Sequence, residues 1–244
     1  MSAKIDIFDE LRNILIKKTK QMRGFLFFKT FFIFLFRRKW LTLPCRVNLK
    51  KYIKFMISEL IRKNRSFRRF HQEIAIPESD LYEMADNARL TPSGRNAQTL
   101  RYILSNTPEM NCLIFPTLSW AGYLAGWGGP KEGERPSAYI VILNDDTVSK
   151  TYFCDHGITS LAILLTAVEK GYGGCIIASV NRDVLREALH IPEKYSIVQV
   201  IALGKPAETV MIDPMIDNDI KYWRDAQEVH HVPKRSLEDI IIKL

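Results

Sequence analysis

The chain has 244 residues, 47% of them hydrophobic, and a formal net charge of +8. This length and composition allow one substantial core or two small ones. The charge is unevenly divided, because residues 1–55 carry 14 Lys/Arg against 3 Asp/Glu and residues 56–244 carry 21 against 24. The mildly acidic larger part argues against a nucleic-acid-binding core.

Residues 1–55 form a basic and apolar extension. Its apolar run, 25–36, is interrupted by Lys29 and is shorter than a bilayer-spanning helix, which needs about 20 residues. No small-residue cleavage site follows at the distance typical of a signal peptide. One interpretation is an anchor that contacts the membrane surface. The other is that the extension contributes nothing to the fold, because Met56 opens a sequence typical of a natural protein start. We therefore place one domain at 56–244.

Helix and strand patterns follow one another in a regular order from Met56 onward. Pro77 and the acidic residues after it favour a helix start, since proline and negative charge suit the first turn. Residues 116–136, here called the cover loop, hold five glycines, three prolines and two tryptophans, as is typical of a loop that covers a ligand. The patterns predict helices at 56–63, from 77 to at least 88, at 107–113, 155–170 and 181–190 and a last one capped by Ser236, and strands at 100–104, 138–143, 175–179 and 196–203.

The helix predicted at 155–170 is apolar nearly all round, so we expect it inside a larger core or between subunits. Asp155 and His156 at its start could form a general base, but capping of the helix start is the favoured interpretation. The stretch 171–174 (Gly-Tyr-Gly-Gly) follows a helix and opens a strand, the reverse of a dinucleotide-binding fingerprint. We interpret it as a helix terminator and tight turn, and we expect 204–206 (Gly-Lys-Pro) to end the last strand.

Residues 62–70, here called the basic segment, contain five Lys or Arg. Arginine presents a planar fork of donors that matches phosphate oxygens, and charge-assisted hydrogen bonds are about twice as strong as neutral ones. Phe67 and Phe70 are expected to point into the protein and fix the segment. The alternative is a solvated basic turn. The polar loop that follows at 91–98 favours the oxyanion-binding interpretation.

A second basic pair, Lys234 and Arg235, lies in the tail. Together with the amide-rich loop at 91–98 and the aromatic cover loop, the two basic groups suit a cofactor with a phosphate at one end and a hydrogen-bonding ring at the other. In such proteins the cofactor does the chemistry. We expect no catalytic residue from the chain itself, because it lacks the G-x-S-x-G, H-E-x-x-H and Walker A patterns.

The four cysteines lie far apart, without a C-x-x-C pair or a histidine at ligand spacing. We expect them to be reduced and mostly buried in a cytoplasmic protein, and we expect no metal site. The pair His230-His231 is expected at the surface or at an interface rather than in a ligand set.

The order of these motifs resembles that of the nitroreductase family of FMN-dependent oxidoreductases. The resemblance covers about residues 56–244. It implies an α+β fold with a central, mostly antiparallel sheet surrounded by helices. It also implies a homodimer with two FMN sites at its interface, and ping-pong hydride transfer from NADH or NADPH through FMN to a small-molecule acceptor. The stretches that carry it are 64–70 (Asn-Arg-Ser-Phe-Arg-Arg-Phe), 92–98 (Pro-Ser-Gly-Arg-Asn-Ala-Gln), 155–157, 171–175, 204–206 and 233–235.

The resemblance also implies a set of cofactor-binding residues. Its members would bind the phosphate (Arg65, Ser66 and Arg68, with charge added by Lys234 and Arg235), lie against the flavin ring from the other subunit (Pro92, Ser93 and Asn96), reach the ribityl chain or the ring edge (Gln98), and face flavin N5 with their backbone (Ala178 and Ser179). Two departures stand out: Asn64 replaces a frequent arginine, and Thr99-Leu100 replaces a proline-aromatic pair.

We therefore expect an FMN-dependent NAD(P)H oxidoreductase that reduces nitroaromatics, quinones or a related small electrophile, with no nucleic acid as partner. The alternative is a membrane-surface or nucleic-acid-associated protein that acts through residues 1–55. Colour separates the two hypotheses, since only the first predicts a yellow protein.

Overall fold

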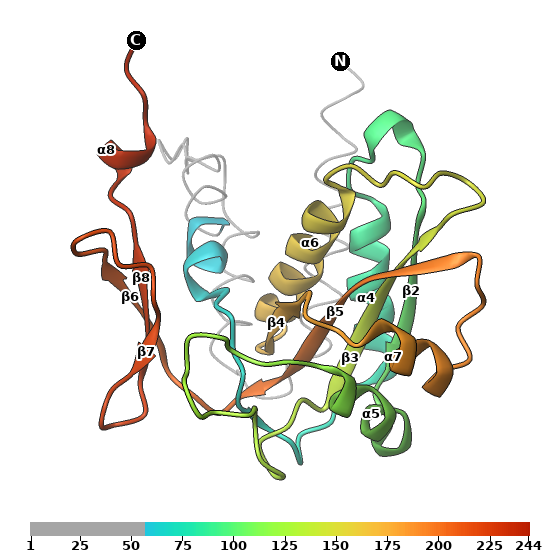
Figure 1. Cartoon of the computed structure of the whole chain (residues 1–244), viewed down its shortest axis with the longest axis horizontal. Helices are drawn as coiled ribbons and strands as arrows, with labels where there is room; N and C mark the ends of the chain where they lie inside the picture. The colour runs from blue at the N-terminus through green and yellow to red at the C-terminus, as the bar shows by residue number, and fades with distance from the viewer. Residues whose placement is uncertain (1–56) are drawn as a thin grey trace, which may run out of the picture. The chain divides into compact units, whose positions relative to one another are not determined.

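The computed structural model describes residues 57–244 (Figure 1). Residues 57–63 are helical and lead into the basic segment, as predicted. The interpretations of residues 1–55 fall outside the described residues, so the division into an extension and one domain stays a prediction. Within 57–244, no helix is long and apolar enough to cross a bilayer.

Five strands form the main sheet, and every pairing in it is antiparallel. This arrangement confirms the predicted α+β class with a mostly antiparallel central sheet. The longest strand, β5 (Tyr195–Pro206), pairs with three others. These are β3 (Ala138–Asp145), β4 (Gly173–Ile177) and β1 (Phe70–His71), while β2 (Leu100–Ser105) pairs with β3.

Helices cover both faces of the main sheet (Figure 1). Successive residues of a strand point to opposite faces, and all eight residues of β3 are buried. Ile140 and Ile142 therefore pack in one core cluster with α4 and α6, while Tyr139 and Val141 pack in a second with α5 and α7. The bounds are Glu78–Arg89 for α4, Pro108–Ile114 for α5, Asp155–Glu169 for α6 and Arg182–Ala188 for α7, with short 3-10 helices η1 at Gly94–Asn96 and η2 at Phe115–Thr117.

Three of these helices begin where the sequence predicts. Pro77 is the N-cap of α4. The side chain of Thr107 accepts a hydrogen bond from the backbone N–H of Met110, and that of Asn181 accepts one from Val184. Each side chain thus satisfies a backbone donor that the helix itself leaves free.

The expected end of the last strand at Gly204 is wrong, because β5 continues through Pro206. Its final residues pair with β1, and a Cβ at Gly204 would lie 2.8 Å from the ring of Phe70. Gly173 and Gly174 are likewise strand residues of β4 rather than turn residues. Only Gly171, with φ +82, acts as the expected helix terminator.

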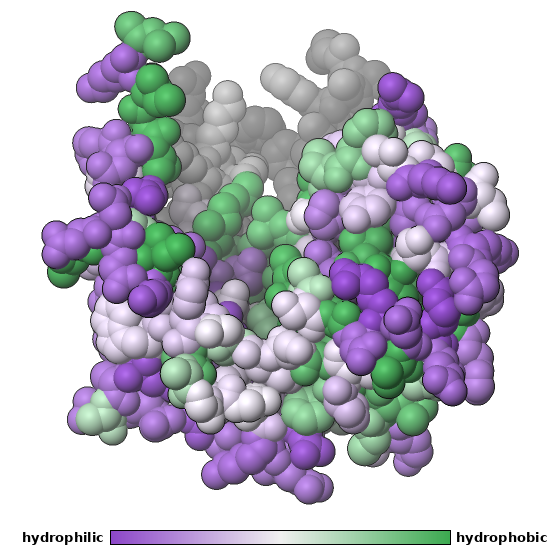
Figure 2. All heavy atoms as spheres, viewed as in Figure 1, coloured by the Kyte–Doolittle hydropathy of each residue, from purple (hydrophilic) through white to green (hydrophobic). Residues whose placement is uncertain are grey.

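A three-stranded sheet near the C-terminus was not predicted. Its order is β6-β8-β7, and the β6–β8 pairing is parallel. The final helix, α8 (Leu237–Ile240), begins at Ser236 in a capping box with Asp239, as predicted. Figure 2 shows apolar side chains along the segment that follows, where Ile242 is 84% exposed. The strands are β6 (Val210–Pro214), β7 (Trp223–Arg224) and β8 (His230–Lys234).

Candidate functional site

The basic segment is fixed to the main sheet by its aromatic residues, as predicted. Phe70 is fully buried in β1. The ring of Phe67 lies over Gly173, where a Cβ would come within 2.5 Å of it. The backbone N–H of Phe67 donates to the carbonyl of Gly174 at 3.1 Å. The cationic side chains between the two rings therefore project from a rigid support.

Arg68 is oriented by groups from the C-terminal sheet. Its Nη1 lies 3.2 Å from Nε2 of His230, and its guanidinium lies 4.8 Å from the ring centre of Tyr222. Because arginine has no acceptor, Nε2 of His230 must accept. Burial, together with the charge of Arg68, lowers the pKa of His230 to about 4, so this histidine is neutral. Nη1 also donates to the carbonyl of Ser66 at 3.2 Å.

Arg69 has a structural role rather than a ligand-binding one. Its guanidinium donates to Glu134 at 2.6 and 3.0 Å and to Glu228 at 2.8 Å. The hydrogen bonds raise the pKa of Arg69 and lower the pKa of Glu134. Arg69 therefore ties the basic segment to the cover loop.

Glu208 anchors the backbone of the basic segment by hydrogen bonds, and no sequence pattern predicts this role. Its side chain is 1% exposed and accepts hydrogen bonds from the backbone N–H groups of Arg68 and Arg69 and from Nη2 of Arg224. A buried carboxylate is tolerated only when it is paired and hydrogen-bonded, as here. Only its long-range partners, 139 and 140 residues away, could have revealed this role.

The guanidinium of Arg68 lines a pocket of about 220 Å³, here called the Arg68 pocket. This pocket brings Arg68 together with Ala178 and Ser179, three residues that the sequence assigned to one site. The cover loop forms another wall, to which Trp120 belongs. Nε1 of Trp120 is buried and has no partner among the described residues. The full lining is Arg68, Ser119–Gly122 and Cys175–Ser179.

Two aromatic contacts fasten the cover loop to the C-terminal sheet. The rings of Tyr123 and Tyr222 lie 5.1 Å apart, and the guanidinium of Arg224 lies 4.4 Å from the ring centre of Trp127. Cation–π contacts of this kind are worth about 0.5–1 kcal/mol or more. The cover loop, the C-terminal sheet and the basic segment therefore meet around the Arg68 pocket.

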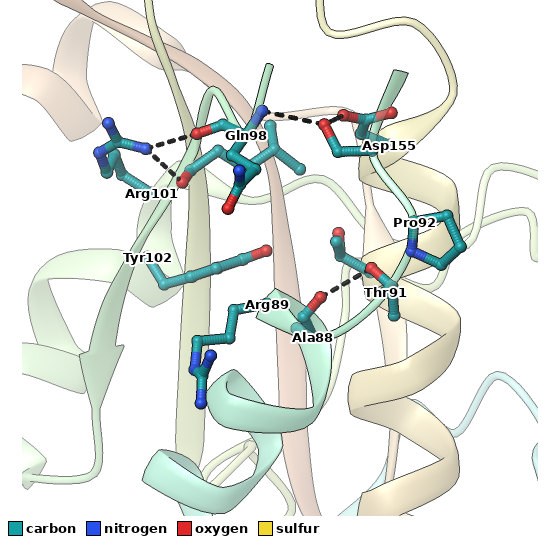
Figure 3. A pocket seen from close by; sticks show the side chains of 11 residues that line it. Ala88, Arg89, Thr91, Pro92, Gln98, Arg101, Tyr102 and Asp155 are labelled. Carbon is teal, nitrogen blue, oxygen red and sulfur yellow. Dashed lines mark hydrogen bonds between the residues drawn. The ribbon is translucent and has the colours of Figure 1, made fainter. Parts of the chain in front are cut away.

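A second pocket, of about 170 Å³, collects other predicted residues and is here called the Ser93 pocket (Figure 3). Pro92, Ser93 and Gln98 line it, and the ring of Tyr102 projects into the space between them. Asn96 is exposed and does not line it. No residue lines both pockets.

The capping role expected for Asp155 is wrong. Cys154 occupies the N-cap of α6 and makes no side-chain capping bond. Asp155 instead turns its carboxylate to the loop, where Oδ2 accepts from Oγ of Ser93 at 2.6 Å and Oδ1 accepts from the N–H of Gly94 at 2.9 Å. These partners lie 61 and 62 residues earlier in the chain, beyond the reach of any local pattern.

Comparisons with known proteins match a large part of this chain. The model of the nitroreductase family matches residues 134–205. A curated relative from Bacillus subtilis (strain 168), named "Putative NAD(P)H nitroreductase YdgI", is 21% identical over 184 residues, which are 62% of this chain and 88% of the relative. A nitroreductase family protein from Clostridium novyi NT has a TM-score of 0.50 and is 27% identical, covering 61% of this chain and 85% of its own.

The chain is therefore similar to the nitroreductase family. Its fold is shared with an FMN-dependent nitroreductase from Clostridium difficile R20291, which has a TM-score of 0.50 and 23% identity over 69% of this chain and 92% of its own. The matches extend well beyond the stretch that the family model covers.

The remaining site residues implied by the resemblance to the nitroreductase family lie apart from both pockets. Nη2 of Arg65 donates to the carbonyl of Ile61 at 2.8 Å, burial lowers the pKa of Arg65, and its Nε is buried without a partner within residues 57–244. Ser66 is exposed and bridges to Gly174. Arg235 donates to Asn218 at 2.8 Å, and Lys234 is exposed at the end of β8.

The expectation that both adjacent histidines lie at a surface or an interface is wrong for His230, which is 1% exposed. His231 lies between Asp213 and Asp225, at 2.8 and 3.2 Å, and stacks on Trp223 with ring centres 4.9 Å apart. The two carboxylates raise the pKa of His231. The adjacent histidines of this domain therefore favour opposite protonation states.

Two of the three described cysteines, Cys112 and Cys154, are exposed, so the expected burial holds only for Cys175. Burial raises the pKa of the Cys175 thiol to about 12. All three are free thiols, as expected of reduced cysteines. The part of the chain that the structure describes has no cluster of His, Cys, Asp or Glu that could hold a metal ion.

Proposed function

We propose that this protein is an FMN-dependent oxidoreductase that passes a hydride from NADH or NADPH to a small electrophilic acceptor such as a nitroaromatic or a quinone. The observation that carries the proposal is the Arg68 pocket, which joins a fixed guanidinium to the backbone of Ala178 and Ser179. The names of two relatives, one an NAD(P)H nitroreductase and one FMN-dependent, support it.

The donors around this pocket fit FMN. The guanidinium of Arg68 suits a phosphate. Arg65, which does not line the pocket, carries a buried Nε without a partner in residues 57–244. Trp120 lines the pocket with a second unpartnered donor among the described side chains. Unmet buried donors are costly, so an acceptor-rich ligand would stabilise them. Ser66, Lys234 and Arg235 would contact the phosphate only if their side chains reorient toward the Arg68 pocket.

FMN, when bound, supplies the chemistry by accepting a hydride and passing it on. The chain's own residues then bind and orient the cofactor. Arg68 would hold the phosphate, while the backbone of Ala178 and Ser179 would face the ring. The cover loop would exclude water through Trp120, which closes one wall of the pocket.

We further propose that the working form is a homodimer. Pro92, Ser93 and Gln98 lie in a pocket separate from that of Arg68, and a loop from a second copy would let one cofactor meet both sets. The helix α6 offers an apolar face for such a contact, on which Leu161 is 47% exposed. Sedimentation at nanomolar concentration should detect a dimer, and a stable folded monomer would contradict this.

The visible spectrum of the purified full-length protein tests the function. We expect a yellow protein with flavin absorbance, which NADH or NADPH bleaches under anaerobic conditions and a quinone or nitroaromatic restores. Comparison of the two nucleotides gives the preferred donor. A colourless protein that does not take up added FMN would contradict the proposal.

A further inference from the structure

The loop at 93–98 is held in a conformation that it would not adopt unaided. Arg95, Asn96 and Gln98 have φ values of 54°, 54° and 50°. Non-glycine residues rarely occupy this left-handed region, and such conformations persist only when the surroundings enforce them. Three such residues within four positions therefore require strong support from outside the loop.

Asp155 provides that support from one side and Phe153 from the other. The carboxylate accepts from both Ser93 and Gly94, and Ser93 Oγ in turn accepts from the N–H of Gln98 at 2.9 Å (Figure 3). A Cβ at Gly94 would lie 2.6 Å from the ring of Phe153. The buried carboxylate of Asp155 thus holds the start of the loop by direct hydrogen bonds. It holds the end of the loop indirectly, because the Ser93 hydroxyl that it binds accepts from the N–H of Gln98.

The helix start that carries this carboxylate is itself fixed to the main sheet. Gln199 of β5 is buried, and its Nε2 donates to Oγ of Ser160 at 2.6 Å and to the carbonyl of His156 at 3.3 Å. Both acceptors belong to the first two turns of α6, which begins at Asp155. The position of the loop therefore depends, through the start of α6, on a central strand of the main sheet.

These bonds also decide what Ser93 can offer a ligand. A hydroxyl has one donor and two acceptor sites, and a carboxylate can only accept. The Ser93 hydrogen is committed to Asp155, and one lone pair is committed to Gln98. Only an acceptor site remains free.

We infer that Asp155 is a positioning residue for the cofactor. It holds the 93–98 loop in its left-handed form and keeps Ser93 a hydrogen-bond acceptor, so that Ser93 meets an N–H donor on the flavin ring. This inference rests on the proposed function for its ligand, whereas the loop geometry stands without it.

Amide hydrogen exchange of the full-length protein without added cofactor tests the loop geometry. Losing a hydrogen bond to a charged group should speed exchange at Gly94 and Gln98 on the order of tenfold in Asp155→Ala. Asp155→Asn keeps an acceptor for Gly94 but must donate to Ser93, so protection should return at Gly94. Asp80→Asn is the matched control, because Asp80 also lies in the first turn of a helix and accepts from Lys170 at 2.9 Å and Tyr172 at 3.1 Å, away from this loop.

FMN titration tests the link to the cofactor. Asp155→Ala should bind FMN at least about tenfold more weakly and should shift the visible spectrum of the bound flavin. Asp155→Asn should shift the spectrum with a smaller loss of affinity. Asp80→Asn should change neither the affinity nor the spectrum. If Asp155→Ala does not fold, the spectrum of Asp155→Asn decides alone. Unchanged exchange at both amides overturns the inference whether or not FMN binds. Wild-type protein that fails to bind FMN overturns the proposed function, and unchanged affinity and spectra in variants of a wild type that binds it overturn only the role of Asp155.

Discussion

Arg68 shows which features of a single residue can be predicted from sequence. Its charge, its cationic neighbours and the flanking Phe67 and Phe70 are local, so the pattern predicts both an anion-binding role and the buried rings. Glu208, which accepts from the backbone N–H of Arg68, and His230, which accepts from its guanidinium, are 140 and 162 residues away. Asp155 was assigned to helix capping for the same reason, since its partners lie outside the window of any local rule.

Arg68→Ala should weaken FMN binding by roughly ten- to a hundredfold, because a charge-assisted hydrogen bond is worth about 1.5–3 kcal/mol. The variant should purify with little flavin and regain activity in excess FMN, since the ring environment is untouched. Arg65→Ala should behave alike. Flavin fluorescence titration measures both affinities.

The control for these variants is Lys63→Ala, which removes a cation from the same segment. The side chain of Lys63 is 63% exposed and is paired only with Glu59 among the described residues. Its FMN affinity should equal that of the wild type. Riboflavin, which lacks the phosphate, should bind wild-type protein much more weakly than FMN, and Arg68→Ala should discriminate less. Equal FMN affinity in all variants would show that the basic segment is a solvated turn.

At the scale of elements, apolar runs predict four of the five strands of the main sheet, because burial on both faces favours apolar residues along most of β3 and β5. The two-residue strand β1 gives no such run. The C-terminal sheet gives no such signal, since β7 has two residues and β6 is largely exposed. The extension of β5 past Gly204 was missed because Gly-Lys-Pro resembles a terminator, while the close approach of Phe70 that requires the glycine is a tertiary contact.

Gly174→Ala should destabilise the domain by about 2 kcal/mol, within the usual range for overpacking. A Cβ at this position would lie 2.3 Å from the backbone oxygen of Ala202, which cannot move without breaking the β4–β5 pairing. Gly128→Ala is the matched control, because nothing lies within 4 Å of its added Cβ. Urea unfolding should separate the two variants, and equal midpoints would argue against the close strand packing.

His231 should make the C-terminal sheet more stable in mild acid. Asp213 and Asp225 raise its pKa in the folded protein above the ordinary value of 6.5. The folded state then binds the proton more tightly than the unfolded state, so the stabilisation is fully present below pH 6.5 and is lost as pH rises through the folded pKa. The neighbouring His230 acts in the opposite sense, since its stabilisation is present above 6.5 and is lost as pH falls toward about 4.

His231→Gln isolates the first effect. The difference in unfolding free energy between wild type and this variant should be largest below pH 6.5 and should shrink at higher pH. An NMR titration of the His231 ring measures the pKa directly, and Asp213→Asn should lower it. A ring that titrates at its ordinary value in wild-type protein would contradict the pairing.

At the scale of the whole molecule, the division of charge could be read from the sequence because it is a sum over many residues, whereas the α+β class followed from the resemblance of the motif order to the nitroreductase family. The pairing of residues into two pockets could not, since it depends on how distant strands align. A chain that begins at Met56 should be yellow and as active as the full chain, because both pockets are built from residues after 67. Loss of FMN on this truncation would instead assign the extension to the site.

The residues that hold Arg68 come much later in the chain than the basic segment. The basic segment leaves the ribosome early, but Glu208, Tyr222 and His230 follow well over a hundred residues later. Contacts of such long sequence separation also form slowly. Until they form, the guanidinium has a charge but no fixed direction. A nascent chain therefore cannot complete this anion site before residues as far as His230 have been synthesised, so cofactor capture would report that translation has passed that point.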